Sequence, residues 1–364
     1  MTSKLPAAAR ALAAQNLDAL LLTPGPDLQY LTGFTHGHAY ERLLALVLRA
    51  GGAARWICPT MNVDQVRPHA AGAAVVPWTD QATYHPALAD ALKGVSSLAF
   101  DDEARAAFLL DALAINPALK IAKASTVMRP LRIRKTADEI AALKVAADTV
   151  DQTIPQAIVL CKPGQTEADI DAALRAALLT RSPDQSVAFT IIAGGPNAAF
   201  PHHETARRPL EAGDVVILDY GTIEPTGYRS DITVTCSVGE PRDPDARKVY
   251  ATVYAAQQAA IAAVRPGVTC QEIDRAARDV IAAAGYGDYF THRTGHGLGL
   301  AGHEPPYMVA GNVLPLEEGM VFSIEPGIYL PGRFGVRLEV IVACGATGAV
   351  MINRHSAPEL PIAR

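Results

Sequence analysis

The stretch KPGQTEADID, residues 162–171, is followed later in the chain by a second copy of its pattern, RPGVTCQEID, residues 265–274. In each copy a Pro-Gly pair leads to a threonine, and an acidic residue stands three positions after that threonine. A threonine in this place can cap the start of a helix, and acidic side chains stabilise the first turn. Two such loops, each leading into a capped helix, predict a duplicated half-domain with a pseudo-twofold axis. The repeat alone leaves open the alternative of two unrelated capped helices.

Apolar runs between and after these two helices predict the strands of the same domain. Short runs of this kind, bounded by turn residues, are typical of strands. They lie at residues 187–193, 215–220, 228–238, 320–324 and 336–342. We therefore expect an α+β domain in which helices cover antiparallel strands.

The N-terminal part of the chain has a different pattern, in which strand-like and helix-like segments alternate. This alternation is typical of an α/β domain. An Arg-Pro pair at residues 129–130 interrupts it, and Thr136 then begins a capping box with Glu139. We therefore expect an α/β domain at residues 1–128 and the α+β domain at residues 129–364.

Composition narrows the class of protein. The chain has 364 residues, of which 49% are hydrophobic and 19% are charged, and its formal net charge is -5. This balance is ordinary for a folded protein, and no run of basic residues indicates nucleic-acid binding. We find no apolar stretch long enough for a membrane helix or a signal peptide. The five cysteines are scattered without a C-x-x-C pair, which argues against disulfides and thiolate metal sites. We therefore expect a cytoplasmic protein that binds neither nucleic acid nor membrane.

Two aspartates lie on either side of an expected hairpin. Asp219 ends the apolar run at 215–218, Asp231 lies in YRSDIT at 228–233, and EPTG at 224–227 has the composition of a turn. The two carboxylates are therefore expected on adjacent antiparallel strands. Two like charges side by side are unfavourable unless a cation holds them. A hairpin that carries two acids is nevertheless common without a metal.

Three further residues suit the same chemistry. His296 lies among glycines in TGHGLG, where the backbone can approach closely, although a flexible glycine loop would look the same. Glu325 follows the apolar run MVFSI, and Glu339 lies inside the apolar stretch VRLEVIV. A carboxylate among apolar residues is unfavourable unless it is paired or metal-bound. Arg337, two residues before Glu339, is the alternative partner for that carboxylate.

Four carboxylates and one imidazole make an oxygen-rich donor set. Such a set suits hard or borderline divalent ions better than a thiolate zinc site does. Four carboxylates would balance the charge of two divalent cations. Two metal ions about 3.5–4 Å apart can activate a water and stabilise a tetrahedral intermediate.

Two other patterns are not expected to form sites. GLGLAG at residues 297–302 matches the dinucleotide-binding fingerprint, but Pro305 and Pro306 follow where that site needs a long helix. His36 and His38 lie in a glycine-containing loop, and we do not expect them to be ligands.

The ordered set of five residues, with its flanks, resembles the pita-bread metallopeptidases, which include prolidase, aminopeptidase P, methionine aminopeptidase and the metal-free creatinase. The resemblance covers essentially the whole second domain. The first domain resembles the creatinase-like N-terminal α/β domain of several branches. The resemblance implies a pita-bread fold for residues 129–364 and two bound divalent metal ions, Mn, Co or Zn, with Asp231 and Glu339 bridging. The implied ligands are Asp219, Asp231, His296, Glu325 and Glu339.

The resemblance also implies a reaction and the residues that act on the substrate. His202 and His303 match the family's histidines beside the substrate, with Glu325 as the proton carrier. His292, Tyr329 and Arg337 match positions that line the active site of aminopeptidase P relatives. The implied reaction is hydrolysis of Xaa-Pro bonds, in dipeptides or at peptide N-termini, by a hydroxide that bridges the two metals. A proline-containing peptide is then the substrate, and a homodimer is the expected assembly.

Several departures from the family's pattern bear on the substrate. The two aspartates are one residue further apart than usual, and Val234 and Val340 replace an arginine and an aspartate. Tyr307 stands where many prolidases carry an arginine that binds the dipeptide carboxylate, and an arginine from elsewhere, such as Arg333, could replace it. These departures leave open a hydrolase or lyase acting on a small non-peptide metabolite. A non-catalytic binding module is also possible, but it would not need all five ligand residues.

Overall fold

The structure, a computed structural model, describes residues 4–35, 41–70 and 72–364, so His36 and His38 lie outside the described residues. The chain divides into two compact units, residues 1–132 and 133–364. The division falls at the end of helix α6 (Ser125–Arg132), whereas the sequence analysis expects it after residue 128. The reason for the difference is that α6 continues through Pro130.

The first unit is built on a six-stranded sheet with the strand order β4-β3-β2-β1-β5-β6. The sheet is mixed, since β1 pairs antiparallel with β2 and parallel with β5. Leu20 and Leu22 of β1 belong to one hydrophobic cluster and Ala19 and Leu21 to another, as the alternation of a strand buried on both faces requires. The other elements are α1 (Leu5–Ala14), β1 (Ala19–Leu22), α2 (Pro26–Thr32), β2 (Ala45–Arg49), β3 (Ala54–Pro59), α3 (Val63–Val66), β4 (Ala74–Trp78), α4 (His85–Ala91), β5 (Ser97–Phe100), α5 (Ala106–Ile115) and β6 (Lys120–Lys123).

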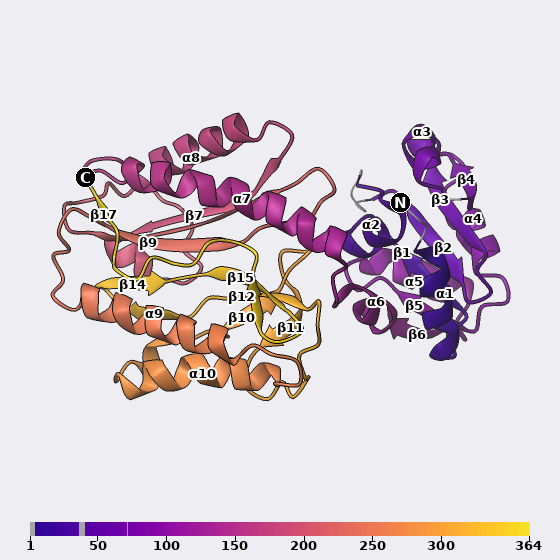
Figure 1. Ribbon diagram of the computed structural model, residues 1–364. Helices are drawn as coiled ribbons and strands as arrows, with labels where there is room; N and C mark the ends of the chain where they lie inside the picture. Colours follow the sequence, from indigo (N-terminus) through magenta and orange to yellow (C-terminus); the bar gives the residue numbers. More distant parts are fainter. Residues whose placement is uncertain (1–3, 36–40, 71) are drawn as a thin grey trace. The chain divides into compact units, whose positions relative to one another are not determined.

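The second unit has its strands between two pairs of long helices, α7 and α8 on one side and α9 and α10 on the other (Figure 1). The strands form sheets with the orders β17-β9-β8-β7, β11-β10-β12-β15-β16 and β13-β14. The helices are α7 (Ala137–Leu160), α8 (Glu167–Arg181), α9 (Ala246–Ala263) and α10 (Cys270–Ala283). The strands are β7 (Ser186–Gly194), β8 (Val215–Ile223), β9 (Ile232–Val238), β10 (Gly295–Gly297), β11 (Glu304–Met308), β12 (Val321–Ile324), β13 (Gly327–Leu330), β14 (Phe334–Arg337), β15 (Val340–Cys344), β16 (Ala349–Met351) and β17 (Ile362–Ala363).

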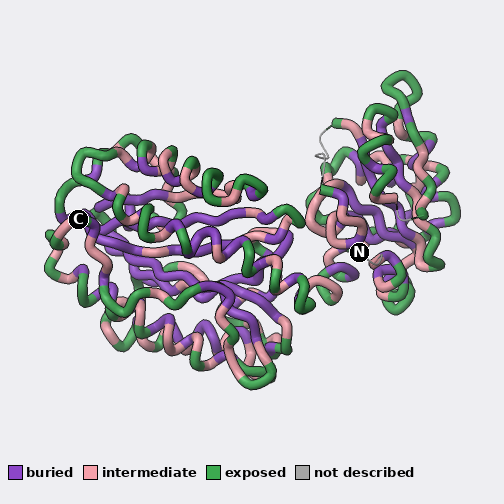
Figure 2. The backbone as a smooth tube through the Cα atoms, turned by 45° about the horizontal axis from the view of Figure 1, so that its top comes forward, coloured by how far each residue is buried: buried purple, intermediate pink, exposed green. Residues whose placement is uncertain are grey.

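The core of this unit is formed by the strands and by the buried faces of the helices. Figure 2 shows the strands as mostly buried and the outer helices as alternating between buried and exposed residues. One large hydrophobic cluster joins Val253 of α9 and Ile273 of α10 to Phe322 of β12 and Val336 of β14. The helices α9 and α10 therefore stabilise the strands that carry the residues described below.

The two Pro-Gly loops of the sequence repeat have the same conformation. Gly164 and Gly267 both have φ of 87°, a left-handed value that favours glycine. The N–H groups of these glycines donate to the carbonyl oxygens of Leu210 and Leu316, each at 2.8 Å. The threonine two residues after each glycine forms a capping box at the start of α8 or α10. These matching contacts confirm the duplicated half-domain.

The apolar run at 336–342 forms two strands and not the single strand expected. β14 pairs with β13, whereas β15 pairs with β12 and β16. Between the two strands, the Leu338 N–H donates to the Pro326 carbonyl at 3.4 Å and the Glu339 N–H donates to the Thr233 carbonyl at 3.0 Å. At these long-range hydrogen bonds the chain passes from the β13-β14 sheet to the sheet that contains β15. The second of them holds Glu339 beside β9.

Candidate metal centre

The five expected ligand residues lie on separate elements that meet in one place. Asp219 is in the middle of β8, and Asp231 immediately precedes the antiparallel strand β9. His296 is the central residue of β10, Glu325 follows β12 and Glu339 precedes β15. Since β10, β12 and β15 are successive strands of one sheet, these last three side chains become neighbours.

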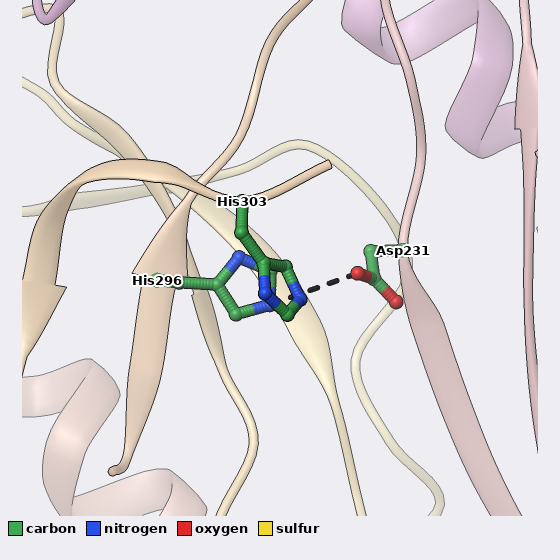
Figure 3. A group of neighbouring side chains, drawn as sticks. All are labelled: Asp231, His296 and His303. Carbon is green, nitrogen blue, oxygen red and sulfur yellow. Dashed lines mark ion pairs between the residues drawn. The ribbon is translucent and has the colours of Figure 1, made fainter. Parts of the chain in front are cut away.

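Three overlapping groups of side chains have ligand atoms within 4.8 Å of one another. The groups are Asp219 with Asp231 and Glu339, His296 with Glu325 and Glu339, and Asp231 with His296 and His303. Because the groups share members, the five expected ligands and His303 form one cluster. Figure 3 shows Asp231 facing the rings of His296 and His303. From the sequence, His303 is expected on the substrate side, and its closeness to Asp231 is not expected.

Burial shapes the acid–base properties of the carboxylates. Asp231 is 7% exposed and Glu339 is 2% exposed. Burial raises the pKa of both carboxyls well above the usual range, and repulsion from neighbouring carboxylates raises each pKa further. Burial also raises the pKa of Glu325 to about 7, although Arg337 opposes this shift. Ionising Asp231, Glu325 and Glu339 together therefore requires additional positive charge in the cluster.

His296 presents a nitrogen lone pair to the same cluster. Its Nδ1 lies 3.1 Å from the Gly297 carbonyl oxygen, so we assign the ring hydrogen to Nδ1. Nε2 then faces Glu325 Oε1 at 3.2 Å and Asp231 Oδ2 at 3.7 Å without a hydrogen. Burial and the neighbouring His303 lower the pKa of His296 to about 3, which keeps the ring neutral. A neutral imidazole with a free Nε2 is the form that binds metals.

Within the cluster, two buried carboxylate oxygens have no hydrogen-bond partner among the described residues. They are Asp219 Oδ1 and Glu339 Oε1. The second oxygen of each group is satisfied, by Arg337 Nη2 at 2.6 Å and by Thr233 Oγ1 at 2.8 Å respectively. A buried acceptor without a donor is unfavourable. Divalent cations would satisfy both oxygens, so the donor set fits the metals that the sequence implies.

Arg337 pairs with Asp219 and not with Glu339. The alternative in which Arg337 neutralises Glu339 is therefore wrong, because the chain crosses from β14 to β15 between these two residues. Arg337 Nη1 also donates to the Tyr329 hydroxyl at 2.9 Å. The hydroxyl lies 2.8 Å from His292 Nε2, and His292 Nδ1 lies 2.7 Å from the Arg293 carbonyl oxygen. Since a carbonyl only accepts, Nδ1 carries the hydrogen and Nε2 accepts from the Tyr329 hydroxyl.

The cluster opens into a cavity of about 900 Å³. His202, His292 and His303 contribute to its walls together with the five expected ligands. Burial lowers the pKa of His292 to about 4, and burial and the nearby Arg293 lower that of His303. Both rings are therefore neutral at physiological pH and can donate or accept a hydrogen bond there.

Glu167, the first residue of α8, is a functional candidate that the sequence analysis misses. Its fully buried carboxylate accepts hydrogen bonds from Gly194 N, Asn197 Nδ2 and Ala206 N, and its Oε2 lies 2.8 Å from His203 Nε2. It thereby fixes the loop that carries His202. From the sequence, this residue has the appearance of an ordinary acid in a first helical turn.

The sequence suggests Arg333 as a replacement for the arginine that is missing at position 307. In the structure Arg333 does not line the cavity. Arg333 Nη2 lies 2.6 Å from Asp243 Oδ1 and 2.7 Å from Asp245 Oδ2, outside the cavity lining. Arg293 lines the cavity instead, with its guanidinium carbon 4.5 Å from the centre of the Tyr307 ring.

Comparisons with known proteins agree with this geometry. Residues 141–346 match the family described as metallopeptidase family M24, and residues 4–134 match the creatinase/prolidase N-terminal domain. The probable dipeptidase PepE of Mycobacterium bovis is 43% identical over 357 residues, which cover 96% of this chain and 93% of that protein. The chain belongs to metallopeptidase family M24.

Two solved structures are similar to this M24 chain over nearly its whole length. A prolidase from Thermococcus sibiricus has a TM-score of 0.94 at 35% identity and covers 99% of this chain and 98% of its own. An Xaa-Pro dipeptidase from Bacillus anthracis has a TM-score of 0.89 at 30% identity, with 99% of both chains covered. The expected architecture, an α/β N-terminal domain followed by a pita-bread domain, is therefore confirmed. Membership of M24 also implies divalent metal ions.

Among the described residues, none of the helices combines the length and apolar character needed to cross a membrane.

Proposed function

We propose that this M24 peptidase hydrolyses Xaa-Pro bonds of dipeptides with the help of two divalent metal ions. The observation that carries the proposal is the cluster of four carboxylates and one imidazole, in which Asp219 Oδ1 and Glu339 Oε1 are buried acceptors without donors. The similar proteins described as a prolidase, an Xaa-Pro dipeptidase and a probable dipeptidase support this class of substrate.

The residues proposed to hold the two cations are Asp219, Asp231, His296, Glu325 and Glu339. Divalent metal ions bound by such a set activate a water and polarise a scissile carbonyl. Among the four carboxylates, Asp231 and Glu339 are the two that belong to two of the three metal-capable groups, which supports their assignment as the bridging ligands. Mn, Co and Zn all suit carboxylate and imidazole donors.

Glu325 is proposed to carry the proton. In an Xaa-Pro bond the nitrogen is a tertiary amide without a hydrogen, so it must gain a proton as it leaves. The Glu325 carboxylate lines the cavity beside the other metal-capable residues, where it can take a proton from the attacking water and give it to the leaving nitrogen. Its Oε1 accepts a hydrogen bond from Ser323 Oγ at 3.1 Å, which restrains its orientation.

His303 is proposed to donate a hydrogen bond to the carbonyl oxygen under attack. Arg293 Nη2 lies 3.2 Å from His303 Nδ1, and an arginine only donates. His303 Nδ1 therefore accepts, and Nε2 carries the hydrogen that can stabilise a developing oxyanion. His202, exposed on the cavity wall, is proposed to bind the substrate backbone.

A substrate panel tests the proposal. The protein is freed of metal with a chelator, dialysed, and assayed with Mn, Co or Zn on Ala-Pro, Ala-Ala, Ala-Pro-Ala and a small non-peptide amide. We expect Ala-Pro to be cleaved fastest. Faster cleavage of Ala-Pro-Ala would instead indicate aminopeptidase P activity. Failure to cleave any proline peptide, together with turnover of the non-peptide amide, would overturn the proposal.

The assembly and location belong to the proposal as well. A homodimer is expected from the family resemblance, and light scattering of the purified protein measures it. The cytoplasmic location stays a prediction from the scattered cysteines, all five of which are free thiols in the structure.

A further inference from the structure

Helix α9 carries a buried amide on a face that is otherwise apolar. Val249, Val253 and Ala260 of this face belong to the large hydrophobic cluster of the second unit, and Gln257, on the same face, is 0% exposed. The amide oxygen of Gln257 has no hydrogen-bond partner among the described residues. A buried polar atom without a partner is unfavourable for folding. Packing alone would therefore favour an apolar side chain of similar size at this position.

The amide nitrogen of Gln257 contacts the backbone immediately before two of the expected metal ligands. Gln257 Nε2 donates to the Leu338 carbonyl oxygen at 2.8 Å and to the Ile324 carbonyl oxygen at 3.3 Å. Leu338 precedes Glu339, and Ile324 precedes Glu325. Because a carbonyl only accepts, the nitrogen of the amide must face both groups, and its two hydrogens match the two acceptors. One side chain therefore joins the backbone segments that carry the two glutamates.

These two backbone segments stop pairing with each other at the same point. The ladder between β12 and β15 ends at the pair formed by Ile324 and Val340. One residue beyond this pair, the N–H groups of the two glutamates donate to different elements, to the carbonyl oxygens of Thr294 and Thr233 at 2.8 and 3.0 Å. The ligand atoms of the two glutamates still lie within 4.8 Å of each other. Gln257 thus spans the two segments where the ladder no longer does.

We propose that Gln257 is a positioning residue, which sets the distance between Glu325 and Glu339 and thereby prepares the cluster for its cations. The inference rests on the proposed function, since it concerns the metal ions of that site. Two ionised carboxylates repel each other and tend to separate while no cation lies between them. Gln257 holds the backbone before each of them, so less freedom is lost in ordering these ligands when a metal binds.

The duplicated half-domain shows that the fold itself does not need an amide at this position. Gln257 lies nine residues before Pro266 of the second Pro-Gly loop, and Ile154 lies nine residues before Pro163 of the first. Helix α7 therefore has an apolar residue where α9 has the amide. The amide occurs in the half that supplies His296 and the two glutamates, which agrees with a role at the metal centre.

The test removes the two donors and keeps the size of the side chain. Gln257→Met should lower the affinity of the metal-free protein for Mn²⁺ by about 10-fold, the lower end of the range for losing a group that orients metal ligands. Calorimetric titration well below the Tm of each metal-free protein measures this affinity without a contribution from unfolding. At saturating Mn²⁺, kcat for Ala-Pro should fall by about 10-fold and KM should change by less than about twofold, because Gln257 does not line the cavity.

Gln258→Met is the matched control. It makes the same substitution at the next residue of α9, where the side-chain nitrogen has no hydrogen-bond partner among the described residues. We expect its Mn²⁺ affinity to stay within about twofold of the wild type. Gln257→Asn is a second variant in case Gln257→Met does not fold. It keeps an amide but is one carbon shorter, so it cannot reach both carbonyls and should show the same loss of affinity.

The outcomes separate this inference from the proposed function. Wild-type Mn²⁺ affinity in a folded Gln257 variant would overturn the inference and leave Xaa-Pro hydrolysis intact. A lower Tm of the metal-free protein with unchanged affinity would show that Gln257 only stabilises the fold, which also overturns it. An equal loss of affinity in Gln258→Met would do the same, because the effect would then belong to α9 as a whole. If the wild type cleaves no proline peptide, the proposed function fails, and the Mn²⁺ titrations still decide the role of Gln257.

Discussion

Arg337 Nη2 lies 2.6 Å from Asp219 Oδ2, and this ion pair is buried inside the carboxylate cluster. Arg337 is 4% exposed and also donates to the Tyr329 hydroxyl and, at 3.2 Å, to the Pro201 carbonyl. The pair joins β14 to β8 and occupies one Asp219 oxygen while leaving Oδ1 without a partner. We therefore infer that Arg337 is a positioning residue, which would act on a bound metal through Asp219.

Arg337→Lys should lower the affinity for divalent metal by about 10- to 100-fold, the usual effect of losing an outer partner of a ligand. An ammonium is a compact charge and cannot contact Asp219, Tyr329 and the Pro201 carbonyl together. Calorimetric titration of the metal-free protein with Mn²⁺ measures the affinity. Arg333→Lys is the matched control, since Arg333 pairs outside the cavity. Unchanged affinity in Arg337→Lys would contradict the positioning role.

Metal affinity should rise with pH up to about 7. In the metal-free fold, burial raises the pKa of Glu325 to about 7 and raises those of Asp231 and Glu339 in the same direction. A raised folded pKa means that the protonated carboxyl stabilises the fold at low pH and that this stability is lost as pH rises through the folded value. A bound cation favours the ionised carboxylates, so metal binding releases protons and its stabilising effect grows with pH.

Two measurements check this pH dependence. Calorimetry at pH 6 in buffers of different ionisation enthalpy should give net proton release on metal binding, and the increase in Tm caused by metal should be larger at pH 7.5 than at pH 5. The imidazole of His296 should contribute nothing to the release, because its pKa is lowered to about 3. Metal binding without proton release would show that the carboxyls are already ionised.

Much of the cluster could be predicted from the sequence because its residues stand next to apolar runs. Asp219 ends one run and Glu325 follows another, and a charge at the end of a buried strand is conspicuous in a sequence. The hairpin between Asp219 and Asp231 was predictable for the same reason, since turn residues separate two strand-like segments. Local patterns of this kind survive folding and appear in the structure as β8, β9 and β12.

The features of the fold and of the site that depend on long-range contacts could not be predicted from the sequence. The run at 336–342 has the pattern of one strand, and only the hydrogen bonds of Leu338 and Glu339 to distant backbone divide it. Arg293 lies in a polar loop, where no periodicity marks a residue that stacks on Tyr307. Such residues acquire their roles from the fold and not from their neighbours in the chain.

Glu325→Gln should lower kcat for Ala-Pro by about 100- to 10,000-fold, the usual range for removing a general acid–base group. Glutamine has nearly the same size but cannot carry the proton that the proline nitrogen needs. Near-wild-type turnover would exclude Glu325 as the proton carrier. Glu318→Gln, an exposed glutamate of the same unit, serves as the control, and thermal unfolding of both variants verifies that the fold is intact.

Glu167→Gln should destabilise the second unit and weaken substrate binding together. One carboxylate oxygen accepts from Gly194 N and Asn197 Nδ2, and the other accepts from Ala206 N and contacts His203. An amide NH₂ in place of either oxygen would face donors, at a cost of about 2–4 kcal/mol for the buried groups left unpaired. We expect Tm to fall by about 5–10 °C and KM for Ala-Pro to rise, because the loop carrying His202 loses its anchor. Glu359→Gln, at an exposed glutamate, should change neither quantity, and a stable Glu167→Gln variant with normal KM would refute the anchoring role.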